Sequence, residues 1–342
     1  MTKLIVQIPC YNEEATLSET VADIPREIEG VDAVELLIID DGSNDATVDV
    51  ARACGVDHIV RNGVNKGLAH SFQRGLDASI ELGADIIVNT DGDNQYCGGD
   101  IPKLIAPILE GRADMVIGDR RTDEIKHFSP LKKRLQKIGS GLVQHLSGLE
   151  TPDAVSGFRA FSRDAAMRLT VRSTFSYTIE TLIQAGKKRL TVVSVPVRTN
   201  AATRPSRLFR SIPHFLARSG STMLRVYAMY EPMRIFLSLG AVLMVSGAAP
   251  ILRFLVSYFM NDGAAGMMQS LLLGGVLFLM GFLSVMFALI ADLAAYNRQL
   301  LELTLERVRR IEFTLGPNRK PSGFPEKRIR AELEELKKSA ER

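Results

Sequence analysis

The chain has 342 residues, of which 46% are hydrophobic and 24% are charged, so it is long enough for one large domain or two smaller ones. This composition excludes a disordered or collagen-like chain. Because 42 lysines and arginines stand against 39 aspartates and glutamates, the net charge of +3 argues against a dedicated nucleic-acid-binding protein. The three cysteines (Cys10, Cys54 and Cys97) are widely spaced, so we expect neither a disulfide framework nor a zinc site.

Short apolar runs alternate with amphipathic stretches along the first two hundred residues. The apolar runs predict buried strands at 4–8, 36–39, 86–88 and 115–117. The stretches between them predict helices near 14–28, 45–54, 66–82 and 101–110. This alternation indicates an α/β domain with a mostly parallel sheet. Ligands of such domains bind beyond the carboxyl ends of the strands, so the residues that follow each strand are the candidate site.

Acidic turns follow three of the predicted strands. They contain Glu13, then Asp40 and Asp41, then Asp91 and Asp93. The sequence lacks GxxxxGK[ST], and no GxGxxG follows the first strand, which disfavours a P-loop or a dinucleotide site. Two aspartates on either side of a glycine predict a divalent cation that also binds two phosphates, because Mg²⁺ prefers oxygen ligands and keeps positions open for substrate.

The last third of the chain is arranged as expected for a membrane anchor. Residues 204–234 interleave arginines with aromatic and aliphatic side chains, which predicts interfacial amphipathic helices. Apolar runs at about 235–260 and 267–291 are each long enough to cross a hydrocarbon core of about 30 Å. The short linker between them predicts a transmembrane hairpin. Since arginines flank the hairpin and its loop has neither lysine nor arginine, we expect an integral inner- or plasma-membrane protein with both termini in the cytoplasm.

Beyond the second apolar run, residues 292–342 predict a cytoplasmic helix and a charged tail. A partial apolar stripe runs along the predicted helix, formed by Leu300, Leu303, Val308, Ile311 and Leu315. Such a stripe predicts either docking on the N-terminal domain or pairing between subunits. A homo-oligomer formed through the transmembrane and C-terminal helices is therefore one expectation.

Several short motifs stand in a definite order along the chain. They are Pro9-x-Tyr11-Asn12-Glu13, Asp40-Asp41-Gly42-Ser43, Asn65-Lys66-Gly67, Asp91-x-Asp93-x-Gln95, Gly118-x-Arg120 and Asp153-x-x-Ser156-Gly157-Phe158-Arg159. Together they resemble the family-2 glycosyltransferases. The last motif, the Arg204-x-Ser206-Arg207 segment and the hairpin are similar to the branch that loads sugars onto polyisoprenyl phosphates, which includes dolichol-phosphate mannose synthase. The motifs cover roughly residues 3–235, whereas the hairpin matches by layout only.

The resemblance implies a fold and a donor site. The fold is a Rossmann-like nucleotide-sugar-binding domain of the GT-A type plus two C-terminal transmembrane helices. Asp91, Asp93 and Gln95 are implied to hold Mg²⁺ or Mn²⁺ against the donor diphosphate. The residues implied to bind the nucleotide-sugar are Pro9, Tyr11, Glu13, Asp41, Lys66, Asp91 and Arg120.

The resemblance also implies an acceptor site. The residues implied to bind the acceptor phosphate are Lys133, Arg204, Ser206 and Arg207. Asp153 matches the residue proposed in this branch as the base or the orienter of the acceptor. Glu180 is the competing carboxylate, because other family-2 enzymes place their base on a comparable later helix. Since a lipid phosphate is already anionic near neutral pH, a strong general base is not essential.

We therefore expect inverting transfer of a sugar, with a UDP-sugar favoured as donor, to an undecaprenyl or dolichyl phosphate at the cytoplasmic membrane face. The alternatives are a membrane polysaccharide synthase with a sugar acceptor and a non-catalytic membrane scaffold. The absence of tryptophan and the presence of only two spans disfavour the polysaccharide synthase. The expected units are a cytoplasmic GT-A catalytic domain at 1–203, interfacial helices at 204–234, a hairpin at 235–291 and a cytoplasmic C-terminal region at 292–342.

Overall fold

The computed structural model describes residues 1–121, 141, 144, 147–171, 177–200, 231–260 and 267–315. Its N-terminal part contains a seven-stranded sheet with the order β3-β2-β1-β4-β6-β5-β7. The strands are β1 (Lys3–Cys10), β2 (Ala33–Asp40), β3 (His58–Arg61), β4 (Ile86–Asn89), β5 (Met115–Asp119), β6 (Arg159–Ser162) and β7 (Val192–Pro196). Neighbouring strands pair in parallel except at β6, which is antiparallel to both β4 and β5. The predicted α/β class with a mostly parallel sheet is confirmed.

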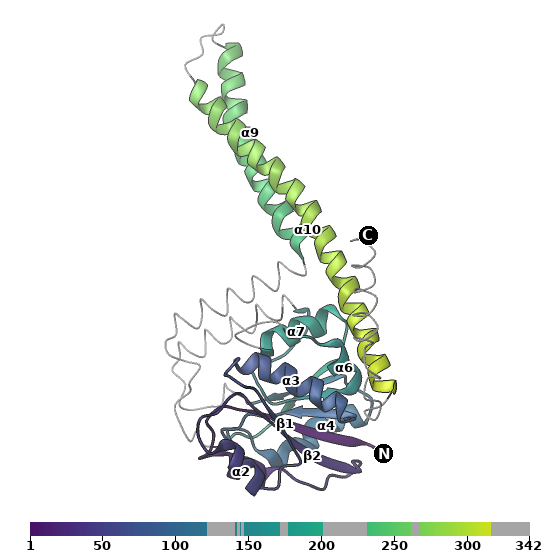
Figure 1. Ribbon diagram of the computed structural model, residues 1–342. Helices are drawn as coiled ribbons and strands as arrows, with labels where there is room; N and C mark the ends of the chain where they lie inside the picture. The colour runs from purple at the N-terminus through teal and green to yellow at the C-terminus, as the bar shows by residue number, and fades with distance from the viewer. Residues whose placement is uncertain are drawn as a thin grey trace, which may run out of the picture.

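Helices cover both faces of this sheet (Figure 1). One face carries α3 (Leu68–Glu81), α6 (Arg163–Arg168) and α7 (Tyr177–Lys187). The other carries α1 (Leu17–Asp23), α2 (Thr47–Ala53), the short 3-10 helix η1 (Gly98–Asp100) and α4 (Ile101–Leu109). Alternate side chains of a strand point to opposite faces, so Ile5 of β1 packs in the first core whereas Leu4 and Val6 pack in the second.

The sequence predicts only part of this sheet. The four predicted strands correspond to β1, β2, β4 and β5, and the four predicted helices to α1, α2, α3 and α4. The missed strands β3, β6 and β7 are four or five residues long, and β3 and β7 are only partly buried. Such strands lack the continuous apolar run that marks a strand buried on both faces.

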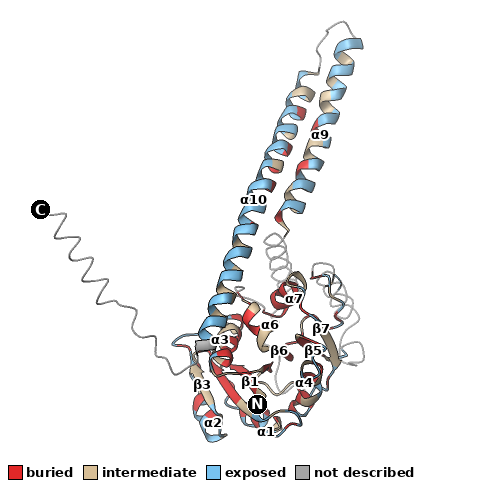
Figure 2. Cartoon of the chain, turned by 90° about the vertical axis from the view of Figure 1, so that its right-hand side faces the viewer, coloured by how far each residue is buried: buried red, intermediate tan, exposed pale blue. Residues whose placement is uncertain are grey.

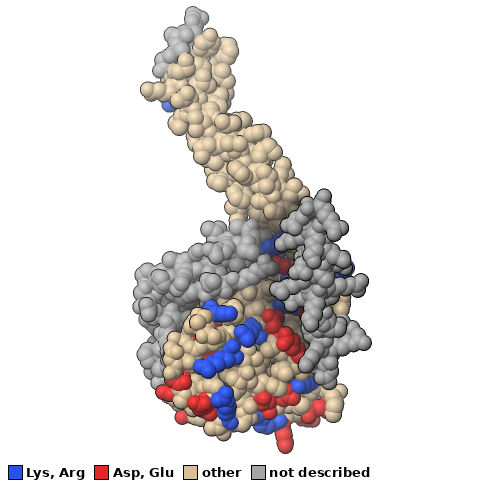
Figure 3. Space-filling model, in the orientation of Figure 1, with Lys and Arg blue, Asp and Glu red and all other residues tan. Residues whose placement is uncertain are grey.

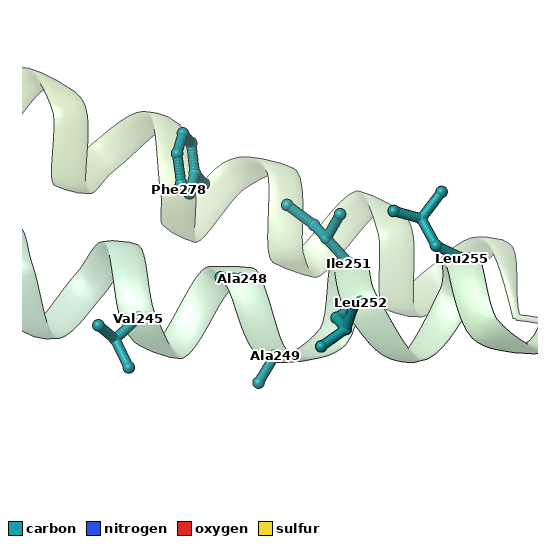
Figure 4. Close-up of a pocket in the computed structure, with 7 residues that line it drawn as sticks. All are labelled: Val245, Ala248, Ala249, Ile251, Leu252, Leu255 and Phe278. Carbon is teal, nitrogen blue, oxygen red and sulfur yellow. The ribbon is translucent and has the colours of Figure 1, made fainter.

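Two long helices form an antiparallel hairpin at the other end of the chain (Figures 1 and 2). They are α9 (Pro232–Met260) and α10 (Met268–Leu315). Both are long and apolar enough to cross a membrane, and only 11% and 22% of their most apolar windows are buried in the protein. The hairpin surface is almost free of charged side chains over most of its length (Figure 3), and a groove lined by Val245, Ile251, Leu255 and Phe278 runs along it (Figure 4). The two helices therefore have the length and the apolar surface of membrane spans.

Glycines allow the two helices to approach closely. A Cβ atom on Gly247 would lie 2.8 Å from the carbonyl oxygen of Gly274, and one on Gly274 would lie 2.7 Å from that of Gly247. Gly240 and Gly281 repeat the same arrangement two helical turns away, at 2.9 and 2.8 Å. In a bilayer, where apolar burial gives little driving force between helices, such small-residue contacts are the main source of association.

Helix α10 continues beyond the apolar run and docks on the N-terminal domain. At 48 residues it is roughly 70 Å long, well over twice the hydrocarbon thickness. Glu302 pairs with Lys188 at 3.1 Å, and Arg309 pairs with Asp77 of α3 at 3.0 Å and donates to two carbonyl groups at the end of α6. The predicted docking is thus made by charged side chains. The apolar stripe lies outside this contact, since Leu300, Leu303, Val308 and Ile311 are all exposed.

The glycine contacts generate a matched test. Gly274→Ala should destabilise the hairpin by about 1–3 kcal/mol, because the added methyl group overlaps the backbone of α9. Gly275→Ala should be neutral or slightly stabilising, because a Cβ atom there meets nothing within 4 Å and alanine is the better helix former. Thermal unfolding of both variants in detergent measures the difference. Equal melting temperatures for the two variants would contradict the packing.

Candidate active site

The loop that follows β1 is held against the loop that follows β2. Asn12 adopts a left-handed conformation with φ of 54°, and its backbone N–H donates to the Ser43 hydroxyl at 3.0 Å. The Glu13 N–H donates to the hydroxyl of Thr47 at 2.8 Å, and the Glu13 side chain is buried. Of the residues expected to bind the donor, Pro9 lies near the end of β1, whereas Tyr11 and Glu13 belong to a loop that two neighbouring hydroxyl groups position.

Asp41 organises the next loop. Its buried carboxylate accepts hydrogen bonds from the Asn62 amide at 2.8 Å and from the backbone N–H groups of Lys66 at 2.9 Å and Gly67 at 2.8 Å. The segment 62–67 thus wraps around one carboxylate, and Arg74 of α3 donates to the side-chain oxygen Oδ1 of Asn62 at 2.8 Å. Contact of Asp41 with the base of a nucleotide stays a prediction. Its role in shaping the loop that carries Lys66 follows from these bonds.

Residues 91–95, which we call the metal turn, follow β4. The carbonyl oxygen of Gly92 accepts from the hydroxyl groups of Thr16 at 2.8 Å and Thr20 at 3.3 Å, both in the α1 region. The Asp93 carboxylate accepts from the Gln95 N–H at 3.3 Å. Asp91, Asp93 and Gln95 are partly exposed, so the turn presents its oxygen atoms at the surface of the sheet edge.

A buried polar network lies behind Asp91 and is centred on Gly157. The Gly157 N–H donates to the Tyr96 hydroxyl at 2.9 Å, and its carbonyl oxygen accepts from the Asn89 amide at 2.9 Å. The Asn89 amide also donates to the Tyr177 hydroxyl at 3.0 Å. A Cβ atom on Gly157 would lie 2.7 Å from the Tyr177 hydroxyl and 3.2 Å from the Asp91 carboxylate. A side chain at position 157 would therefore displace the Tyr177 hydroxyl and crowd the Asp91 carboxylate.

Asp153 and Arg120 form a forked ion pair beside this network. Nε of Arg120 donates to one carboxylate oxygen of Asp153 at 2.7 Å and an Nη group donates to the other at 3.0 Å. Asp153 is only 1% exposed, so its charge depends on this partner. Burial alone would lower the pKa of Arg120, but Tyr96, Asp153 and Asp91 outweigh burial and raise it. A carboxylate held in this way is suited to orienting the arginine.

Arg159 is fully buried and links the loop at 153–158 to helix α7. It donates to the carbonyl oxygens of Ala154, Ser156 and Thr178 at 2.7–2.8 Å and to the Thr181 hydroxyl at 2.7 Å. Burial lowers the pKa of its guanidinium to about 10, although the charge of Asp153 opposes this shift. Arg159 belongs to a sequence motif that predicts no role for it, because burial of an arginine among neutral acceptors is a tertiary property.

The electrostatics of the sheet edge suit a cation. Burial and the negative charges of Glu13, Asp40 and Asp91 raise the pKa of the Cys10 thiol well above its usual value. The described residues contain no group of three histidine, cysteine, aspartate or glutamate side chains arranged as a closed metal site. The two carboxylates and one amide of the metal turn fit an open Mg²⁺ or Mn²⁺ site, in which water and phosphate oxygens supply the remaining ligands.

The remaining predicted residues divide into two groups. Glu180 is buried on α7, where it accepts from the Gln184 amide at 3.3 Å, and Gln184 in turn binds the backbone of Thr170. Glu180 thus bonds with a neighbour on its own helix, whereas Asp153 binds Arg120 directly. The predicted acceptor residues lie outside the described part of the chain: Lys133, Arg204, Ser206 and Arg207.

Comparisons with known proteins identify the family. The model of "Glycosyl transferase family 2" matches residues 5–170. A UDP-N-acetylglucosamine–dolichyl-phosphate N-acetylglucosaminyltransferase of Methanococcus voltae is 30% identical over 214 residues, which are 56% of this chain and 83% of that protein. The chain belongs to glycosyl transferase family 2. Glycosyltransferase AglJ of Haloferax volcanii is 27% identical over 89% of this chain and 95% of its own length, so that similarity extends into the hairpin.

Solved structures of this glycosyltransferase's fold neighbours agree with the architecture. Glucosyl-3-phosphoglycerate synthase of Mycobacterium tuberculosis, crystallised with phosphoglyceric acid, superposes with a TM-score of 0.51 at 23% identity. The match covers 66% of this chain and 79% of that one. The predicted GT-A fold is confirmed, together with two C-terminal helices that have the length and composition of membrane spans.

The network behind Asp91 predicts the effect of a small substitution in this glycosyltransferase. Gly157→Ala should lower sugar transfer by about 10-fold or more, because the methyl group displaces the Asp91 carboxylate or the Tyr177 hydroxyl from a packed position. Gly63→Ala is the matched control, since a Cβ atom there meets nothing within 4 Å. Turnover and melting temperature of both variants provide the measurement. Full activity of Gly157→Ala would show that Asp91 tolerates displacement.

Proposed function

We propose that this glycosyltransferase transfers a sugar from a nucleotide-sugar, with UDP-sugars favoured, to a polyisoprenyl phosphate of the undecaprenyl or dolichyl type. The observation that carries the proposal is the combination of the metal turn and the Arg120–Asp153 pair with an apolar hairpin that docks on the same domain. The name of the Methanococcus voltae relative supports a dolichyl phosphate acceptor, as does that of a dolichol-phosphate mannosyltransferase of Pyrococcus furiosus, 30% identical over 57% of this chain.

The chemistry requires neutralisation of a diphosphate leaving group. When bound at Asp91, Asp93 and Gln95, a divalent cation would supply most of this neutralisation. Arg120 lies within electrostatic reach of Asp91, so its guanidinium adds positive charge at the same place. Asp153 holds that guanidinium by two hydrogen bonds and thereby fixes the direction of its remaining donors.

The acceptor would react directly. An oxygen of the lipid phosphate forms a bond to the anomeric carbon while the bond from that carbon to the diphosphate oxygen breaks, and the nucleoside diphosphate leaves with the electron pair. A single in-line displacement inverts the anomeric centre. Because the lipid phosphate is already anionic, Asp153 acts as an orienter of Arg120 in this proposal and not as a strong base.

The hairpin would hold the site at the membrane surface. Two adjacent lysines at the end of α7 link the domain to the hairpin. Lys187 pairs with Glu231, which directly precedes α9, at 2.6 Å. Lys188 pairs with Glu302 of α10 at 3.1 Å. A polyisoprenyl phosphate keeps its charged head at the bilayer surface, so a catalytic domain fixed there meets its acceptor. Positive charge flanking the hairpin supports a cytoplasmic location of this domain and of both termini.

An acceptor assay tests the proposal. The purified protein in lipid nanodiscs should transfer label from one member of a panel of UDP- and GDP-sugars only when polyprenyl phosphate and Mg²⁺ or Mn²⁺ are both present. Asp93→Asn should reduce transfer by about 100-fold or more, the scale for losing a positioned catalytic charge, and EDTA should abolish it reversibly. Transfer to a free sugar without lipid phosphate would favour the polysaccharide synthase instead.

A double-mutant cycle tests the role of Asp153. If Asp153 acts through Arg120, the turnover of the double variant Asp153→Asn/Arg120→Lys should be about the same as that of the more impaired single variant, because both changes break one unit. Glu180→Gln is the comparison and should retain most turnover. Single-turnover transfer and donor affinity are measured for each variant. Multiplicative losses from the two single changes would assign Asp153 an independent role as base.

A further inference from the structure

The chain that leaves β7 runs antiparallel to the end of the metal turn. We call residues 197–200 the strap. Thr199 forms a β-bridge with Tyr96, the Cys97 N–H donates to the Arg198 carbonyl oxygen at 3.4 Å, and the Asn200 N–H donates to the Gln95 carbonyl oxygen at 2.9 Å. The strap therefore continues the sheet by a few residues along the outer side of the turn.

The side chain of Asn200 binds the centre of the metal turn. Its amide nitrogen lies 3.1 Å from the carbonyl oxygen of Asn94, 3.3 Å from the Asn94 side-chain oxygen and 3.5 Å from the carbonyl oxygen of Tyr96. Asn94 stands between Asp93 and Gln95 and has a left-handed backbone with φ of 55°. Asparagine adopts this conformation more readily than other non-glycine residues, but the right-handed region remains the more favourable one. The bonds from Asn200 to the backbone and side-chain oxygens of Asn94 favour the left-handed conformation.

The strap has a strong anchor of its own. The fully buried Asp100 carboxylate accepts from the Arg198 N–H at 2.7 Å, from the Arg198 guanidinium at 3.0 Å and from Lys103 at 2.9 Å. Burial favours a higher pKa for the Asp100 carboxyl, but the bonds from Arg198 and Lys103 outweigh burial and lower the pKa from 3.8 to about 2. The Asp100 carboxylate is thus charged at any physiological pH, and its bonds to Arg198 hold the strap, and with it Asn200, in place.

We propose that Asn200 is a positioning residue that holds Asp93 and Gln95 in the geometry for binding a divalent cation. The proposal rests on the function proposed above, because it concerns the metal turn of that site. Asn200 binds the turn at the residue between the two ligands, so loss of its amide frees Asn94 to leave the left-handed conformation. Binding of the metal would then also have to order Asp93 and Gln95, and the cost of this ordering weakens metal binding although no ligand is lost.

The test measures metal binding directly. Mn²⁺ is titrated into the full-length protein in detergent with saturating UDP, and free Mn²⁺ is followed by electron paramagnetic resonance. Asn200→Ala should raise the dissociation constant for Mn²⁺ about 3- to 10-fold, the range for losing a neutral hydrogen bond. Turnover at saturating Mn²⁺ should stay within about 2-fold of the unchanged protein, since no ligand is lost.

The control is Asn297→Ala, the same chemical change at an exposed position of α10. It should leave Mn²⁺ binding unchanged. The melting temperature of Asn200→Ala without metal should equal that of the unchanged protein, which separates positioning from general stability. Unchanged Mn²⁺ affinity in Asn200→Ala would overturn the proposal, as would a protein that binds no Mn²⁺ with UDP. Weaker Mn²⁺ binding in a protein that shows no lipid-phosphate transfer would support the role of Asn200 and contradict only the proposed acceptor.

Discussion

The parallel register of β1, β2 and β4 is the constraint on which the site depends. Cys10 pairs with Asp40 and Gln7 pairs with Asn89, so the chain leaves all three strands at one edge of the sheet. The loops that carry the acidic residues must therefore meet there. Their carboxylates repel one another, and the structure separates their roles. Asp41 shapes a loop through three hydrogen bonds, whereas Asp91 and Asp93 remain partly exposed.

Strand β6 is antiparallel to its neighbours, so the loop that precedes it, and not the loop that follows it, lies at this edge of the sheet. Arg159, its first residue, pairs with Asn89 of β4 and Ile117 of β5, so the loop that precedes β6 arrives where its neighbours end. That loop brings Asp153 to Arg120 and Gly157 to Asp91. A parallel strand in this position would direct the same loop to the far edge of the sheet. The direction of one four-residue strand therefore determines whether the sixth motif joins the site.

The membrane hairpin and the catalytic domain are connected through the rigidity of α10. Close glycine contacts hold α9 and α10 together, and the same α10 continues without a break to the ion pairs with Lys188 and Asp77. A single surface ion pair contributes little, but several pairs along one helix restrict its orientation. These ion pairs thus fix the orientation of the domain relative to the hairpin.

The sequence by itself determined the main strands, the acidic turns and the apolar hairpin, because burial on both faces, turn chemistry and membrane length each leave a local pattern. It also indicated the family through the order of its motifs. The tertiary structure alone decided that Arg120 bonds to Asp153, that Gly157 adjoins Asp91 and that Asn200 bonds to Asn94. Residues more than 30 positions apart make these contacts. Their partners depend on strand order and direction, which no local pattern records: β6 has only two apolar residues, and a serine interrupts the valines of β7.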